Sequence, residues 1–148
     1  MSNQAVAIHA DLSDRPTARG IARHLVTTAR IAMGLAFFVF GLNGFLNFIP
    51  PPSGPVPAGA MAFGGALMQT GYMFPLIKGT ETLVGLLLLS NLFVPLALVL
   101  IAPVLVNIIA FHAFLAPNDI GIPVVLVAIE LVLAWTHRKA YRPLFARR

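Results

Sequence analysis

The side chains of this sequence that could do chemistry are few, and they stand inside or beside long apolar stretches. Hydrophobic residues make up 58% of the 148 residues and charged residues only 10%. A soluble domain usually carries charge at about a quarter of its residues, so lipid is the natural solvent for this chain. Polar groups are costly in a bilayer, and each one needs a partner or a function. Eight of them stand out: Asn43, Asn47, Gln69, Lys78, Glu81, Asn107, His112 and Glu130.

Lys78 and Glu81 are the charged residues inside one apolar stretch, and their spacing of three places them on the same face of a helix. One interpretation is a self-neutralising ion pair that lets the helix enter the bilayer. Another is a ligand or proton site that uses one or both charges. The two interpretations are compatible.

Three further residues are candidates for ligand binding or proton relay. His112 could give or take a proton near neutral pH, although a lone histidine is more often a packing residue. Asn107 could orient a ligand. Glu130 has no partner in its own stretch and is a functional candidate for that reason. The structural alternatives for Glu130 are a buried protonated acid or a pairing with Asn107 or Lys78.

Asn43 and Asn47 are four residues apart and are predicted to share a helix face. Such asparagines often hydrogen-bond neighbouring helices, so we assign them to helix packing. Gly34, Gly41 and Gly44 in the same stretch are predicted to bring that helix close to a neighbour.

Several chemistries are excluded or not indicated. The chain has no cysteine, which excludes disulfides, thiolate metal sites and Cys-ligated iron–sulfur clusters. No nucleotide-binding loop and no metal-ligand cluster is present in the sequence, so no metal site is predicted. The basic ends lack the polar and aromatic context of a nucleic-acid site, and anionic lipid explains them better.

The apolar segments predict an all-α, integral membrane four-helix bundle. The spans are expected at about residues 25–48, 73–90, 93–115 and 122–137, because a spanning helix needs about 20 apolar residues. Residues 60–72 are apolar but short and glycine-rich, which favours an interfacial or re-entrant helix between spans one and two. Residues 1–24 are predicted to be a polar, flexible tail, and 138–148 a basic tail.

The basic residues predict the orientation. Nine of the ten lie near the two ends of the chain, and the tenth is Lys78. Both termini are therefore expected on the cytoplasmic side of a bacterial-type inner membrane. In that topology seven of the eight polar residues converge on the outer half of the bundle, and Glu130 lies deeper.

Four segments in this order resemble proteins of the DoxX family, over about Ala29 to Phe145. They are residues 34–44 (GLAFFVFGLNG), 78–85 (KGTETLVG), 103–112 (PVLVNIIAFH) and 141–145 (YRPLF). The resemblance implies a four-helix inner-membrane protein. Some relatives are subunits of quinone-linked oxidoreductases, and others accompany soluble redox or detoxifying proteins.

Three functions stay open at this point. The first is a membrane subunit of a redox system that binds a quinone-like or other lipophilic ligand, and that acts with a partner rather than as a complete enzyme. The second is a non-catalytic anchor or assembly partner that recruits a soluble protein through its basic ends. The third is a small-solute transporter, which would need a homo-oligomer to form a path.

Overall fold

The computed structural model describes residues 18–50 and 54–145, and the regular elements of those residues are all helical, as predicted. Three helices are long and apolar enough to cross a membrane, and a fourth apolar helix is shorter, at 16 residues. The described chain is thus a helical bundle with the features of a membrane protein. Its elements are α2 (Ala18–Leu46), α3 (Ala58–Gln69), α4 (Met73–Ser90), α5 (Val94–Leu115), η1 (Pro117–Asp119), α6 (Gly121–Thr136), α7 (Arg138–Tyr141) and η2 (Arg142–Phe145).

The helix boundaries lie close to the ends of the predicted apolar segments, except near the two ends of the chain. Residues 18–24, which were predicted to be tail, are the first turns of α2, because no proline or glycine pair interrupts them and alanine and arginine favour a helix. The rest of the predicted N-terminal tail lies outside the described residues. The predicted basic tail forms α7 and η2 as far as Phe145.

Asn43 and Asn47 lie at the end of α2, and their hydrogen bonds there are local; the predicted contacts with neighbouring helices stay a prediction. Asn43 Oδ1 accepts a hydrogen bond of 2.7 Å from the backbone N–H of Ile49. Asn47 has a φ of 50° and donates its backbone N–H to the carbonyl of Asn43. Asparagine tolerates this left-handed conformation better than most residues, which explains why the helix ends here.

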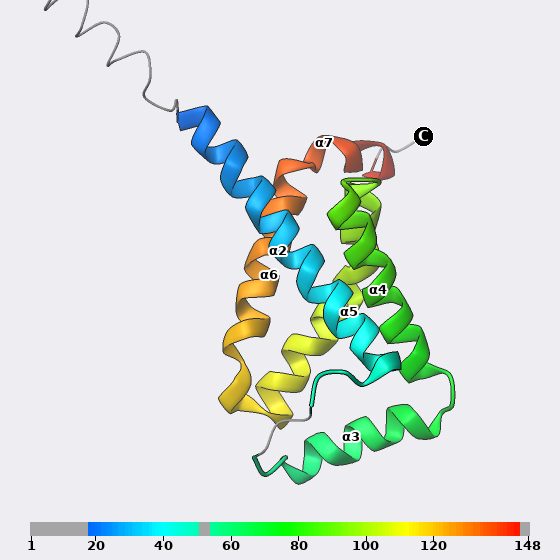
Figure 1. Cartoon of the computed structure of the whole chain (residues 1–148). Helices are drawn as coiled ribbons and strands as arrows, with labels where there is room; N and C mark the ends of the chain where they lie inside the picture. Colours follow the sequence, from blue (N-terminus) through cyan, green and yellow to red (C-terminus); the bar gives the residue numbers. More distant parts are fainter. Residues whose placement is uncertain (1–17, 51–53, 146–148) are drawn as a thin grey trace, which may run out of the picture.

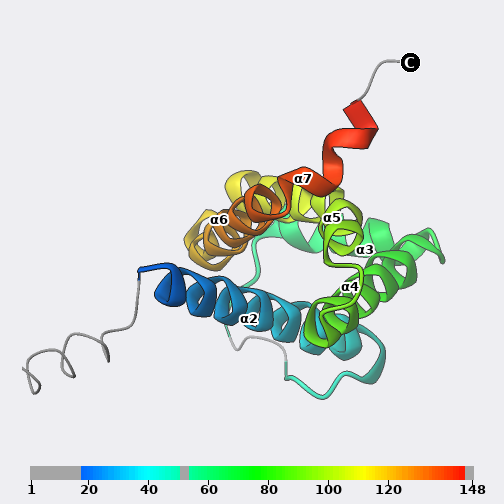
Figure 2. The same cartoon turned by 90° about the horizontal axis from the view of Figure 1, so that it is seen from above.

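The four long helices form a closed ring. α2 contacts α4 and α6, and α5 contacts the same two helices (Figure 2). Successive long helices run in alternating directions between the two ends of the ring, and α3 lies across one of these ends (Figure 1). We call this the α3 end. The start of α2 and helix α7 lie at the opposite end, which we call the α7 end (Figure 1).

Apolar side chains fill the ring and also cover its outside. The interior cluster includes Met33, Phe37, Val84, Leu88, Leu98, Ile101, Leu105 and Leu133. Large apolar side chains are also exposed on the outward faces of all four helices, among them Leu35, Phe40, Leu83, Leu86, Val99, Val106, Val124 and Leu131. Helices that are apolar on all sides are typical of a membrane span.

Glycines allow α2 and α4 to approach closely, as predicted for Gly34, Gly41 and Gly44. A Cβ atom at Gly41 would lie 2.6 Å from the backbone nitrogen of Thr82, and one at Gly34 would lie 3.1 Å from Leu88 Cβ. Gly85 contributes from α4, because a Cβ there would collide with the backbone of Phe38. Small residues at such positions let membrane helices pack backbone to backbone.

Arg30 adds a polar contact to the same helix pair at the α7 end. Helix α4 ends with a left-handed Asn91 (φ 58°), and the N–H of Leu92 returns to the carbonyl of Leu87 at 3.0 Å. The Arg30 guanidinium of α2 donates to the carbonyl of Leu88 in this last turn. A cation is favourable there because the carbonyl end of a helix carries partial negative charge.

Substituting Gly85 tests the close approach of α2 and α4. We expect Gly85→Ala to destabilise the bundle by about 1–3 kcal/mol, because the new methyl group would force the two backbones apart. Gly79→Ala is the matched control on the same helix, since a Cβ at Gly79 meets no other atom within 4 Å. Thermal unfolding of the purified protein in detergent measures both. Equal melting of the two variants would contradict the proposed packing.

Candidate ligand cavity

A cavity of about 460 Å³ lies between α3, α4 and α5 at the α3 end of the bundle. Its walls are mostly apolar, and α3 closes one side through Phe63 and Leu67. Cavities of this size and lining are typical of small-molecule sites. We call it the α3–α4–α5 cavity.

Four of the five predicted ligand or proton-relay residues line this cavity. Lys78 and Glu81 come from α4, and Asn107 and His112 come from α5. The sequence predicted that these residues lie at a similar depth, in the outer half of the bundle. The structure adds that α4 and α5 are neighbours, which brings both pairs to one space.

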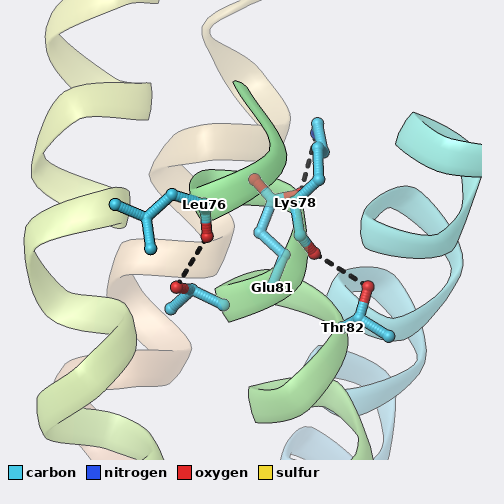
Figure 3. A network of polar contacts seen from close by, with 5 residues as sticks. Leu76, Lys78, Glu81 and Thr82 are labelled. Atoms are coloured by element: carbon cyan, nitrogen blue, oxygen red, sulfur yellow. Dashed lines mark hydrogen bonds and ion pairs between the residues drawn. The ribbon is translucent and has the colours of Figure 1, made fainter. Parts of the chain in front are cut away.

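The Lys78–Glu81 ion pair is the most enclosed polar feature of the cavity. The distance from Lys78 Nζ to Glu81 Oε2 is 2.8 Å, and Glu81 is only 4% exposed (Figure 3). The absence of a side chain at Gly44 of α2 leaves room for the Lys78 stem. The Lys78 ammonium also lies 6.0 Å from the centre of the Phe74 ring. The tight α2–α4 contact therefore positions this pair.

The neighbouring hydroxyl groups are bonded to their own helix. Thr82 Oγ1 donates to the carbonyl of Lys78 and Thr80 Oγ1 to that of Leu76, both at 2.8 Å (Figure 3). Such bonds satisfy a hydroxyl in an apolar environment. The charged pair, rather than these threonines, is thus the polar group of α4 that a ligand would meet.

His112 lines the cavity, and one of its ring nitrogens is bonded to the backbone of α5. Its Nδ1 lies 2.8 Å from the carbonyl oxygen of Ile108. A carbonyl only accepts, so Nδ1 carries the hydrogen and Nε2 of the neutral ring is left as an acceptor. His112 can therefore accept a proton or a hydrogen bond at Nε2.

Aromatic rings form a wall of the cavity, and the sequence analysis did not single them out. The Phe63 and Phe111 ring centres are 5.6 Å apart and join α3 to α5. Phe111 also meets the His112 ring edge-on at 5.1 Å. Helical spacing was the signal available: Phe74 precedes Lys78 by four residues, and Phe111 follows Asn107 by four.

Glu130 does not belong to the cavity. It lies in the second half of α6, where it is 9% exposed and its Oε2 has no hydrogen-bond partner among the described residues. Lys78 is bonded to Glu81 instead, so the predicted alternative of a Lys78–Glu130 pair is not what the structure shows. The predicted group of five thus divides into a cluster of four and one isolated acid.

Comparison of the chain with family models, curated proteins and solved structures finds no match. The features of the chain that bear on its function are therefore the cavity and the sequence motifs that supply its residues.

The arrangement suits an amphipathic ligand with a flat ring. The aromatic and aliphatic walls can hold the ring and an apolar tail, and the ion pair, the Asn107 amide and His112 Nε2 can meet polar atoms on it. The charges of Lys78 and Glu81 neutralise each other. A strongly ionic ligand would therefore lose its hydration in the cavity without gaining an unpaired opposite charge.

Separating the two charges of the ion pair tests its structural contribution. We expect Glu81→Gln to destabilise the protein by about 3 kcal/mol, because it leaves the Lys78 ammonium without its partner in an enclosed site. The double variant Lys78→Met with Glu81→Gln should recover most of this loss. Unfolding curves of the three proteins in mixed detergent measure the effect. A double variant no more stable than Glu81→Gln would show that the pair is not a structural unit.

Proposed function

We propose that this chain is a membrane subunit of a redox system and binds a quinone-like lipophilic ligand in the α3–α4–α5 cavity. The observation that carries the proposal is the convergence of Lys78, Glu81, Asn107 and His112 on one mostly apolar space. A volume of about 460 Å³ can take a quinone ring with the first part of its tail.

Each polar residue has a role in this proposal. The Lys78 ammonium donates a hydrogen bond to one ring carbonyl, and Glu81 holds the ammonium in place. The Asn107 amide orients the ring from α5. His112 passes a proton through Nε2, because its Nδ1–H is bonded to the backbone. A partner redox protein, soluble or membrane-bound, supplies the electrons.

The resemblance to DoxX-like proteins supports the same proposal. Two of the resembling segments, 78–85 and 103–112, are the ones that supply all four polar residues of the cavity. The resemblance implies quinone-linked redox systems for some relatives, and the cavity has the lining that such a ligand needs.

We further propose that α6 is a fourth span and that both chain ends face the cytoplasm. At about 1.5 Å per residue α6 is about 24 Å long and covers most of the hydrocarbon core of a bilayer, which is about 30 Å thick. The exposed Trp135 ring at its end, with the Arg138 guanidinium 5.0 Å from the ring centre, is typical of a membrane interface. Helix α3 would then lie in the outer interface or re-enter the bilayer.

The basic segment at the α7 end supports a second candidate function, that of an anchor for a soluble protein. Arg138, Lys139 and Arg142 are exposed on α7 and η2. The Tyr141 hydroxyl donates to the carbonyl of Pro95 at 3.2 Å and holds this segment against α5. An ordered basic surface of this kind suits an acidic partner or anionic lipid.

Cysteine accessibility tests the proposed topology, and the chain suits it because it has no cysteine of its own. We expect Gln69→Cys, at the end of α3, to react with a membrane-impermeant maleimide in intact cells. Lys139→Cys, on α7, should react only after the inner membrane is opened. Labelling of both positions from the same side would contradict an even number of spans.

Ligand analysis tests the proposed site. Native mass spectrometry of the protein extracted gently from its own membrane should show a bound quinone or similar redox lipid. His112→Ala and Asn107→Leu leave the ion pair intact and should weaken binding of a short-chain quinone at least about tenfold, which corresponds to about 1.4 kcal/mol. Gln69→Ala, outside the cavity, is the control.

Two outcomes would separate the candidate functions. Unchanged quinone binding in both cavity variants would refute the ligand site. A co-purified soluble protein without any bound redox lipid, lost when the exposed basic residues of α7 and η2 are replaced, would favour the anchor.

A further inference from the structure

The Glu130 carboxyl is a buried acid that the proposed ligand site does not use. On α6 it shares a face with Leu133, which belongs to the apolar interior of the bundle. An apolar side chain would pack there without any cost of desolvation. A carboxyl at this position with an unpartnered oxygen therefore needs a function.

The charged groups of the neighbouring elements are either bonded elsewhere or exposed. Helix α6 contacts α2, α5, α7 and η1. Arg23 and His24 of α2 and Asp119 of η1 are exposed. Arg30 of α2 donates to the carbonyl of Leu88, and His112 of α5 lies in the cavity at the other end. Arg138 of α7 donates to the carbonyl of Trp135 on the exposed surface, where Lys139 also lies. His137, at the end of α6, has its Nδ1 2.9 Å from the carbonyl of Leu133.

Tyr141 is a titratable group whose pKa depends on the charge of Glu130. Burial raises the pKa of the Tyr141 hydroxyl above its ordinary value, and the charge of a Glu130 carboxylate raises the pKa further. The hydroxyl therefore stays protonated and donates a hydrogen bond to the Pro95 carbonyl. Tyr141 is thus a half-buried polar group of α7 that lies near the buried acid.

An unpaired carboxylate in this apolar interior would lose its hydration without gaining a cation. Binding one proton removes that penalty, because a neutral acid is far cheaper to bury than an ion. We propose that Glu130 is a proton-binding site, separate from the α3–α4–α5 cavity, which exchanges its proton with water at the α7 end past Tyr141. In this exchange the Glu130 O–H bond breaks heterolytically, water takes the proton and the electron pair stays on the carboxylate.

The isolation of Glu130 makes it reactive in a way that Glu81 is not. A lipophilic carbodiimide takes the proton of a carboxylic acid on one nitrogen while the carboxylate oxygen bonds to its central carbon. The acyl group then migrates from oxygen to nitrogen, so the whole reagent stays attached as an N-acylurea. The reaction needs a protonated acid in an apolar site. Glu81 is held as the partner of the Lys78 ammonium instead.

The test is labelling of the full chain in detergent with dicyclohexylcarbodiimide, followed by intact mass and peptide mapping. We expect one adduct per chain, on Glu130, with a rate that falls as the pH rises. Glu130→Gln should lose the adduct, and Glu81→Gln should keep the adduct on Glu130. Peptide mapping of the labelled protein without any substitution identifies the residue even where a variant folds poorly. No adduct on Glu130, or labelling independent of pH, would overturn the proposal.

Infrared spectroscopy tests the route past Tyr141. The carbonyl stretch of a protonated Glu130 should be present at mildly acidic pH, disappear at alkaline pH and be absent from Glu130→Gln. Its shift on transfer to D₂O should be at least about tenfold faster in Tyr141→Ala than in the unaltered chain, with Tyr141→Phe as the control that keeps the ring. A band that never titrates would make the acid a permanent structural group and overturn the site. An exchange rate unaffected by Tyr141→Ala would overturn the route.

Discussion

The close approach of α2 and α4 is the contact on which the rest of the structure depends. Small residues on both helices remove the side chains that would otherwise hold the backbones apart: Gly34, Gly41 and Gly44 on α2, and Gly85 on α4. In a bilayer the hydrophobic effect does not drive helices together, so dispersion contacts between backbones have to do so. This approach gives the Lys78 stem its place beside Gly44 and brings Arg30 within reach of the last turn of α4. The position of the Lys78 side chain and the Arg30 contact at the end of α4 both depend on it.

The polar groups of the bundle fall into three arrangements, which differ in the partners that the polar atoms have. Hydroxyl groups such as those of Thr80 and Thr82 return to carbonyls of their own helix. The charges of Lys78 and Glu81 neutralise each other. Glu130 alone among these has a buried oxygen without a partner in the described structure. The first arrangement is structural, the second is structural but accessible to a ligand, and the third requires a proton.

The two proposed sites occupy separate parts of one apolar interior. The α3–α4–α5 cavity is closed by α3, whose aromatic contact with Phe111 makes the helix part of the site rather than a connector. Glu130 lies in the half of α6 that is nearer α7. Leu105 and Ile101 belong to the apolar cluster of α5 between its two ends, so the structure keeps the ligand chemistry and the proton site apart.

The sequence by itself determined the helices and the identity of the polar residues within them. Apart from the start of α2, apolar length and the breakers at Pro50, Asn91 and Pro117 place the elements to within a few residues, because a bilayer admits few other ways to satisfy a backbone. The spacing of Lys78 and Glu81 predicted their ion pair for the same local reason. Only the tertiary structure decided which helices are neighbours. It separated Glu130 from the other candidates and added the phenylalanine wall. Those outcomes depend on the closed order of the ring, which arises from contacts between residues far apart in the chain that no local pattern encodes.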